Sequence, residues 1–161
     1  MGTLVDSAAF ILLERAHRRL SPSEALAVVS WRLARELGAD EEVAIASITA
    51  SELLQGVHRA TREHRMRREA FVEAVLETFP TVPFDLRCAR VHSRPWTDLV
   101  AAGADIGSHD RVIAATALAG GWRLATHDVR HFRNVHGLDL VELDLSDLKR
   151  SAADQRRDRD H

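Results

Sequence analysis

Residues 43–54 read Val-Ala-Ile-Ala-Ser-Ile-Thr-Ala-Ser-Glu-Leu-Leu and predict a strand that passes directly into a helix. The apolar, β-branched run at 43–48 fits a strand that is buried inside a sheet. Thr49 and Glu52 then have the spacing of a capping box, which favours a helix that begins at this point. A buried strand followed at once by a helix is the repeating unit of an α/β sheet, so this stretch decides the fold class.

The same strand-to-helix junction recurs on both sides of this stretch. Before it, an apolar strand at 3–5 precedes a helix at 8–20; after it, a strand at 122–125 precedes a short helical turn at Asp128. The rest of the pattern predicts helices at 22–38, from Thr49 through about 77, at 85–103 and from Ser108 to 119, a loop or short edge strand at 79–84, and a last strand at 138–143. Because parallel neighbours need crossover helices, this alternation predicts a three-layer α/β fold with a mostly parallel central sheet.

The composition is that of an ordinary globular protein, with 161 residues and a formal net charge of -2. We expect one domain at 1–149 and a disordered charged tail at 150–161, which lacks apolar periodicity. The single cysteine, Cys88, excludes an internal disulfide and is compatible with a reducing cytosol. The apolar run at 8–13 is too short to cross a membrane, so we expect a cytoplasmic protein with no membrane partner.

Four acidic residues fall at the predicted junctions between strands and helices: Asp6, Glu52, Asp110 and Asp128. In an open α/β sheet these junctions gather at the carboxyl edge of the strands, where such folds bind ligands. Four carboxylates in one cleft repel one another unless their pKa values rise or a cation neutralises them. Hard oxygen ligands suit Mg²⁺ or Mn²⁺. Taken separately, Glu52, Asp110 and Asp128 also fit the first turn of a helix, whereas Asp6 directly follows a buried strand and needs a partner.

The segments that contain these acids read LVDS at 4–7, ITASELLQG at 48–56, IGSHDRVIAA at 106–115 and ATHDVRHF at 125–132. In this order they resemble the four motifs of PIN-domain ribonucleases, specifically the VapC-type toxins of toxin-antitoxin pairs. The resemblance covers about residues 3–142. It implies a three-layer α/β/α PIN-like domain.

The resemblance also implies a reaction and a set of site residues. Asp6, Glu52, Asp110 and Asp128 would be catalytic and would hold one or two Mg²⁺ or Mn²⁺ ions, with Thr126 supporting the last acid or a metal-bound water. The substrate would be structured RNA, cut by activated water to leave a 5′-phosphate and a 3′-hydroxyl. The partners would be a small antitoxin that occludes the site and a second copy of the chain in a homodimer.

Two further features lie on the helix that follows Glu52. Arginines dominate residues 58–68, and Arg59, Arg62 and Arg65 are candidates for contacts with RNA phosphates, which would make cleavage sensitive to salt. The alternative is a solvated helix face or an antitoxin contact. Gly56 inside a helix is unfavourable relative to alanine, so we expect another helix to approach it closely.

Other interpretations of the acidic residues stay open at this point. A nuclease acting on single-stranded or flap DNA could use the same cleft. A receiver-like domain also has acids at strand ends, but it needs a lysine near a late strand and Lys149 lies beyond the last one predicted. A domain that binds antitoxin or RNA without cutting, and a zinc site at His127 and His131, are the remaining alternatives.

Overall fold

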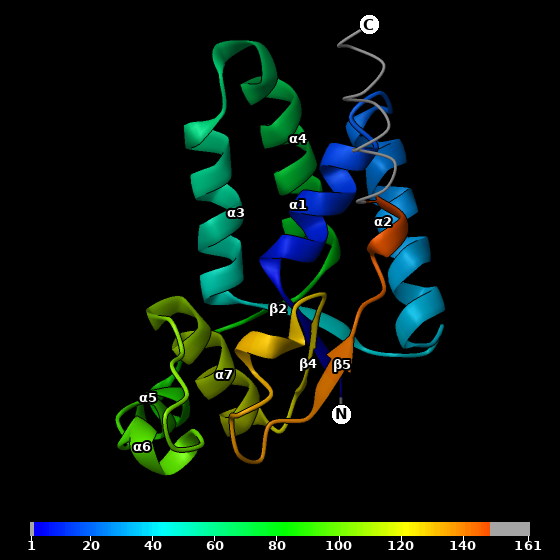
Figure 1. Ribbon diagram of the computed structural model, residues 1–161. Helices are drawn as coiled ribbons and strands as arrows, with labels where there is room; N and C mark the ends of the chain where they lie inside the picture. The colour runs from blue at the N-terminus through cyan, green and yellow to red at the C-terminus, as the bar shows by residue number, and fades with distance from the viewer. Residues whose placement is uncertain (1, 149–161) are drawn as a thin grey trace, which may run out of the picture.

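The computed structural model describes residues 2–148, and these form a five-stranded sheet with helices on both faces (Figure 1). The strands are β1 (Thr3–Val5), β2 (Val43–Ala46), β3 (Thr81–Val82), β4 (Arg123–Thr126) and β5 (Leu140–Glu142). Their order is β3-β2-β1-β4-β5, and each neighbouring pair is parallel. The predicted parallel α/β fold is confirmed. A receiver domain has the order 2-1-3-4-5, so the receiver-like alternative is wrong.

Successive side chains along the central strands point to opposite faces of the sheet, and this alternation builds two hydrophobic layers. Val5, Ile45 and Ala125 pack against α1 (Ser7–Ala16), α2 (Pro22–Leu37), α3 (Ser47–Arg59) and α4 (Arg62–Thr78). Leu4, Ala44 and Leu124 lie in the other layer, which is covered by α6 (Trp96–Leu99) and α7 (Ser108–Gly120), with α5 (Leu86–His92) packed against α7. The three-layer prediction is therefore confirmed.

Helices α3 and α4 form an antiparallel hairpin that extends away from the sheet (Figure 1). A partly buried ion pair joins this hairpin to α1: Arg67 donates from Nη1 to Glu14 Oε1 at 2.6 Å. The Nη2 atom of Arg67 donates to the carbonyl oxygens of His17 and Leu20 at 3.1 and 2.7 Å, after the end of α1. These bonds join the first half of α4 to the end of α1 and to the turn that follows it.

The start of α3 differs from the prediction. The strand ends at Ala46 and the helix begins at Ser47, with no side-chain cap, so Glu52 lies in the second turn rather than the first. Thr49, the predicted cap, is completely buried inside the first turn. Packing against the core has overridden the local capping preference, and the capping box is wrong.

Three other boundaries differ as well. The predicted helix at 85–103 is divided into α5 and α6 because Pro95, which precedes α6, cannot continue the helical hydrogen bonding. The predicted helix through 77 is divided at Ala60, between α3 and α4. Helix α7 has Gly107 rather than Ser108 as its N-cap residue, and it ends at Gly120, one residue after the predicted end. These differences leave the order of the strands in the sheet as it is.

Two smaller expectations can also be compared with the structure. A Cβ atom at Gly56 would meet no described atom within 4 Å, so the expected close approach of another helix is wrong. The predicted tail at 150–161 lies outside the described residues. Within residues 2–148, no helix is both long and apolar enough to cross a membrane.

Candidate active site

The site lies at the carboxyl ends of β1 and β4, the two strands between which the sheet order reverses. Such a switch point leaves a crevice because the connections on its two sides run in opposite directions. Asp6 directly follows β1, and its backbone N–H donates to the carbonyl oxygen of Ala125 at 3.0 Å. Thr126 ends β4, and Asp128 follows two residues later. The topology thus brings together residues that are 120 apart in sequence.

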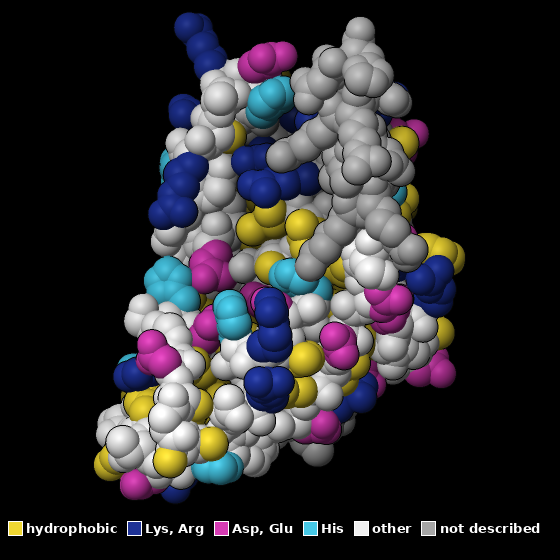
Figure 2. Space-filling model, in the orientation of Figure 1, with side chains coloured by type: hydrophobic (Ala, Val, Ile, Leu, Met, Phe, Trp, Pro, Cys, Tyr) yellow, Lys and Arg dark blue, Asp and Glu magenta, His cyan; other side chains and the backbone are white. Residues whose placement is uncertain are grey.

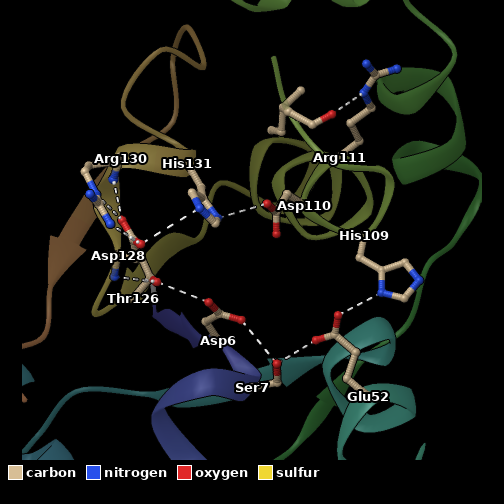
Figure 3. Close-up of polar contacts among 11 residues, drawn as sticks. Asp6, Ser7, Glu52, His109, Asp110, Arg111, Thr126, Asp128, Arg130 and His131 are labelled. Carbon is tan, nitrogen blue, oxygen red and sulfur yellow. Dashed lines mark hydrogen bonds and ion pairs between the residues drawn. The ribbon is translucent and has the colours of Figure 1, made fainter. Parts of the chain in front are cut away.

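The other two predicted acids reach this crevice from helices. Glu52 projects from the second turn of α3, and Asp110 is the third residue of α7. Figure 3 shows Asp6, Glu52 and Asp110 facing a common space, with Asp128 at its side. The structure therefore brings all four predicted acids and Thr126 into one site, while their roles stay a prediction.

Thr126 connects two of the acids. Its hydroxyl donates to Asp6 Oδ2 at 3.1 Å and accepts a hydrogen bond from the backbone N–H of Asp128 at 3.2 Å (Figure 3). The side chain is 1% exposed, so water does not compete for either bond. Thr126 consequently fixes the carboxylate of Asp6 as well as the turn that presents Asp128.

Glu52 is held from two sides by residues that the sequence analysis did not single out. The hydroxyl of Ser7 donates to Glu52 Oε2 at 2.6 Å and lies 3.4 Å from Asp6 Oδ1. On the other side, Nδ1 of His109 lies 2.9 Å from Glu52 Oε1. Ser7 follows Asp6 in the sequence and His109 precedes Asp110, and these neighbouring positions are the one feature of the sequence that could have pointed to the two residues.

Asp110 and Asp128 also have partners that spacing did not reveal. His131 Nδ1 lies 3.4 Å from Asp110 Oδ2, and its Nε2 lies 3.8 Å from Asp128 Oδ2. Arg130 forms a bidentate pair with Asp128, with Nε 2.9 Å from Oδ1 and Nη2 2.9 Å from Oδ2. Asp128 is therefore the acid whose charge is matched by a cation of the chain itself.

The pKa values of Asp6, Asp110 and Asp128 differ according to whether an arginine pairs with the carboxylate. Burial raises the pKa of Asp6 above its usual range, opposed by the Thr126 hydrogen bond and reinforced by the charge of Glu52. Burial also raises the pKa of Asp110; nearby His131 opposes this shift, and the charges of Asp6 and Glu52 add to it. The hydrogen bonds from Arg130 hold the pKa of Asp128 well below its usual range. Asp6, Glu52 and Asp110 thus form an acidic group in need of a cation.

The donor chemistry fits a hard divalent ion better than zinc. Carboxylate oxygens are the ligands that Mg²⁺ and Mn²⁺ prefer. Within residues 2–148, no three His, Cys, Asp or Glu side chains already stand close enough together to hold a metal. His131 faces Asp110 and Asp128, while the buried Nδ1 of His127 has no hydrogen-bond partner in the described part of the chain. Within residues 2–148, the two histidines that the sequence suggests for zinc therefore belong to no group of three side chains that could hold a metal.

The three candidate RNA-binding arginines lie at the far end of the helical hairpin rather than among the acids. Arg59 ends α3, Arg62 begins α4, and all three side chains are exposed. The rise between Glu52 and Arg59 is about 10 Å along the helix axis. Arg65 donates to the carbonyl oxygens of His58 and Ala60, both at 3.3 Å, so it also caps the end of α3.

The fold and the site together define an open parallel α/β protein with a cluster of carboxylates at its switch point. The sequence model of the PIN domain matches residues 4–138, and the chain belongs to the PIN-domain family. It is 32% identical over 148 residues to "Ribonuclease VapC1" of Rickettsia felis, a match that covers 91% of this chain and 100% of the relative.

Solved structures agree on the fold. VapBC2 from Rickettsia felis, bound to a DNA fragment from its promoter, aligns with a TM-score of 0.70 at 21% identity, covering 89% of this chain and 100% of that chain. DNA-bound VapBC from Salmonella typhimurium aligns with a TM-score of 0.66 at 20% identity, covering 89% and 98%. The PIN-like three-layer architecture predicted from the motifs is therefore confirmed.

Proposed function

We propose that this protein is a metal-dependent endoribonuclease and the toxin of a toxin-antitoxin pair. The observation that carries the proposal is the meeting of Asp6, Glu52 and Asp110 around one space at the switch point of the sheet. The assignment to RNA is supported by the similarity over 91% of the chain to a relative named as a VapC ribonuclease. We also propose that it acts in the cytoplasm, where it would meet this substrate.

Asp6, Glu52 and Asp110 would hold Mg²⁺ or Mn²⁺, and Asp128 would join them if Arg130 released it. Such an ion, when bound, supplies an activated water and neutralises charge that develops on the attacked phosphate. The unmatched charges and raised pKa values of Asp6 and Asp110 support this set of ligands, because a divalent cation would relieve both.

The remaining side chains of the site orient the carboxylates. Thr126 holds one oxygen of Asp6, and Ser7 and His109 each hold one oxygen of Glu52. These bonds limit the rotation of acids that come from three different elements, so less ordering is required when an ion and a phosphate bind. Farther out, Arg59, Arg62 and Arg65 would contact RNA phosphates along the hairpin.

The proposed protein partner is a small antitoxin. Two structural neighbours support a partner of this kind: VapBC-5 from Mycobacterium tuberculosis, of the VapBC family of toxin-antitoxin systems, and a toxin-antitoxin complex from Klebsiella pneumoniae. Figure 2 shows a hollow beside the acidic site in which hydrophobic side chains lie among arginines, a surface suited to an amphipathic segment. We also propose a homodimer, which a mass measurement in solution tests.

Cleavage of a structured RNA by wild type and by Asp110→Asn tests the proposal. The wild type should cut with Mg²⁺ or Mn²⁺ and not with EDTA, and the products should carry 5′-phosphate and 3′-hydroxyl ends. Asp110→Asn should not cut, whereas Asp105→Asn, which removes an exposed carboxylate from the loop that precedes α7, should cut normally. Products with a 2′,3′-cyclic phosphate would contradict the proposed water attack, and faster cutting of single-stranded or flap DNA would favour the DNA alternative.

A further inference from the structure

Arg130 occupies both oxygens of the carboxylate of Asp128. Its Nε and Nη2 atoms lie 2.9 Å from Oδ1 and Oδ2, and its backbone N–H donates to Oδ1 at 3.3 Å (Figure 3). Within residues 2–148, His131 is the other charged or titratable group that pairs with this carboxylate, with its Nε2 3.8 Å from Oδ2. A metal ion that approaches Asp128 would meet the positive charge of this guanidinium, so the two cations compete for the carboxylate.

The ion pair between Arg130 and Asp128 is largely exposed on the side of the arginine. The side chain of Arg130 is 75% exposed, and that of Asp128 is 24% exposed. Exposed ion pairs contribute little to stability, because water solvates both partners and because the long side chain loses freedom when it is held. A divalent ion brings two positive charges to the same carboxylate and can replace the guanidinium there.

The displaced guanidinium would stand beside the site with its charge unmatched. A planar guanidinium binds a phosphate in the same bidentate way as it binds a carboxylate. An RNA phosphate held among the acids would therefore offer Arg130 a substitute for the oxygens that it gives up.

We propose that Arg130 is a substrate-binding residue that exchanges partners, pairing with Asp128 in the metal-free protein and with an RNA phosphate once a divalent ion takes Asp128. This inference rests on the proposed nuclease function. Arg130 would then have two opposite effects, because its side chain would lower the affinity for the metal ion and raise the affinity for RNA. A residue that merely stabilises the turn would show neither.

Arg130→Gln removes the competitor and the phosphate ligand together. The Kd for Mn²⁺ should fall by about two- to fivefold, the range expected when a weak exposed pair no longer has to be broken. The Kd for RNA in the presence of the metal should rise by about five- to tenfold, with the salt slope reduced by about 0.7 to 1. Arg133→Gln is the matched control, because Arg133 is exposed on the same segment and no ion pair is recorded for it in residues 2–148.

The experiment measures Mn²⁺ binding by electron paramagnetic resonance and RNA binding by fluorescence anisotropy of a labelled hairpin. Anisotropy is recorded with Ca²⁺ in place of Mg²⁺, with the RNA checked for cleavage, and again in EDTA. We expect Arg130→Gln to bind Mn²⁺ more tightly than wild type and Arg133→Gln, and to lose RNA affinity more in Ca²⁺ than in EDTA. Arg130→Lys should retain part of the RNA affinity, since it keeps the charge without the fork.

Unchanged or weaker Mn²⁺ binding by Arg130→Gln, or equal tightening by Arg133→Gln, would overturn the exchange with the metal. RNA affinity equal to that of wild type in Ca²⁺ would overturn the contact with phosphate. Failure of the wild type to bind Mn²⁺ or to cut RNA is a different result. It would overturn the proposed nuclease function, and this inference with it.

Discussion

Replacement of Thr126 by valine tests the local connection on which the site depends. Valine keeps the shape of threonine but removes the hydroxyl, which donates to Asp6 Oδ2 and accepts from the backbone N–H of Asp128. Because the side chain is 1% exposed, water cannot replace either bond without a rearrangement. The substitution therefore removes the donor to Oδ2 of Asp6 and leaves the backbone N–H of Asp128 without the acceptor that it has in the wild type.

The expected loss follows from these two bonds. A hydrogen bond to a charged group contributes about 1.5–3 kcal/mol and a neutral one about 0.5–1.5 kcal/mol, so Thr126→Val should lower the free energy of unfolding by about 2–4 kcal/mol at neutral pH. The corresponding fall in Tm is about 5–15 °C for a domain of this size. The loss should be smaller in acid, because a protonated Asp6 has less need of a donor than an ionised one.

Urea unfolding of wild type, Thr126→Val and Thr126→Ser at neutral and acidic pH measures these differences. Serine keeps the hydroxyl and should lose only about 1 kcal/mol for the missing methyl group. The reasoning is refuted if valine is as stable as serine at neutral pH, or if the loss caused by valine does not depend on pH.

Three other substitutions have defined outcomes. Asp6→Asn should abolish cleavage and should stabilise the metal-free protein at neutral pH. Because the pKa of Asp6 is raised in the folded state, the stability of the wild type falls as pH rises through that pKa. The variant should show a smaller fall, which urea unfolding from pH 4 to 8 measures. Ser7→Ala should weaken Mn²⁺ binding by about tenfold, with Ser7→Thr restoring most of it, because the hydroxyl fixes Glu52; equal Kd values for alanine and wild type would contradict this role. Gly56→Ala should raise the free energy of unfolding by about 0.5–1 kcal/mol, since no described atom would contact the new methyl group, and a destabilised variant would show that the helix cannot accept it.

Much of the fold and the meeting of the acids could be predicted from the sequence because both depend on topology. Strands followed at once by helices require parallel pairing, and parallel pairing places the carboxyl ends of the strands at one edge. Asp6 and Asp128 could therefore be placed together although 121 residues separate them along the chain. Nothing about their individual contacts was needed for that inference.

The predictions failed where tertiary packing decides. Thr49 has the spacing of a cap, but the core buries it completely and α3 begins two residues earlier. The roles of Ser7 and Arg130 depend on which side-chain rotamers the packed structure selects. Sequence spacing does not specify rotamers. The hydrogen bond from Ser7 to Glu52 and the ion pair of Arg130 with Asp128 therefore could not be predicted from the sequence.

Anomalous scattering from crystals of the wild-type protein grown with Mn²⁺ would test the central claim most directly. The proposed function predicts a manganese peak in the space between Asp6 and Asp110, with carboxylate oxygens of both residues bound to it. A peak that lies elsewhere on the molecule, or bound Mn²⁺ that contacts neither carboxylate, would contradict it.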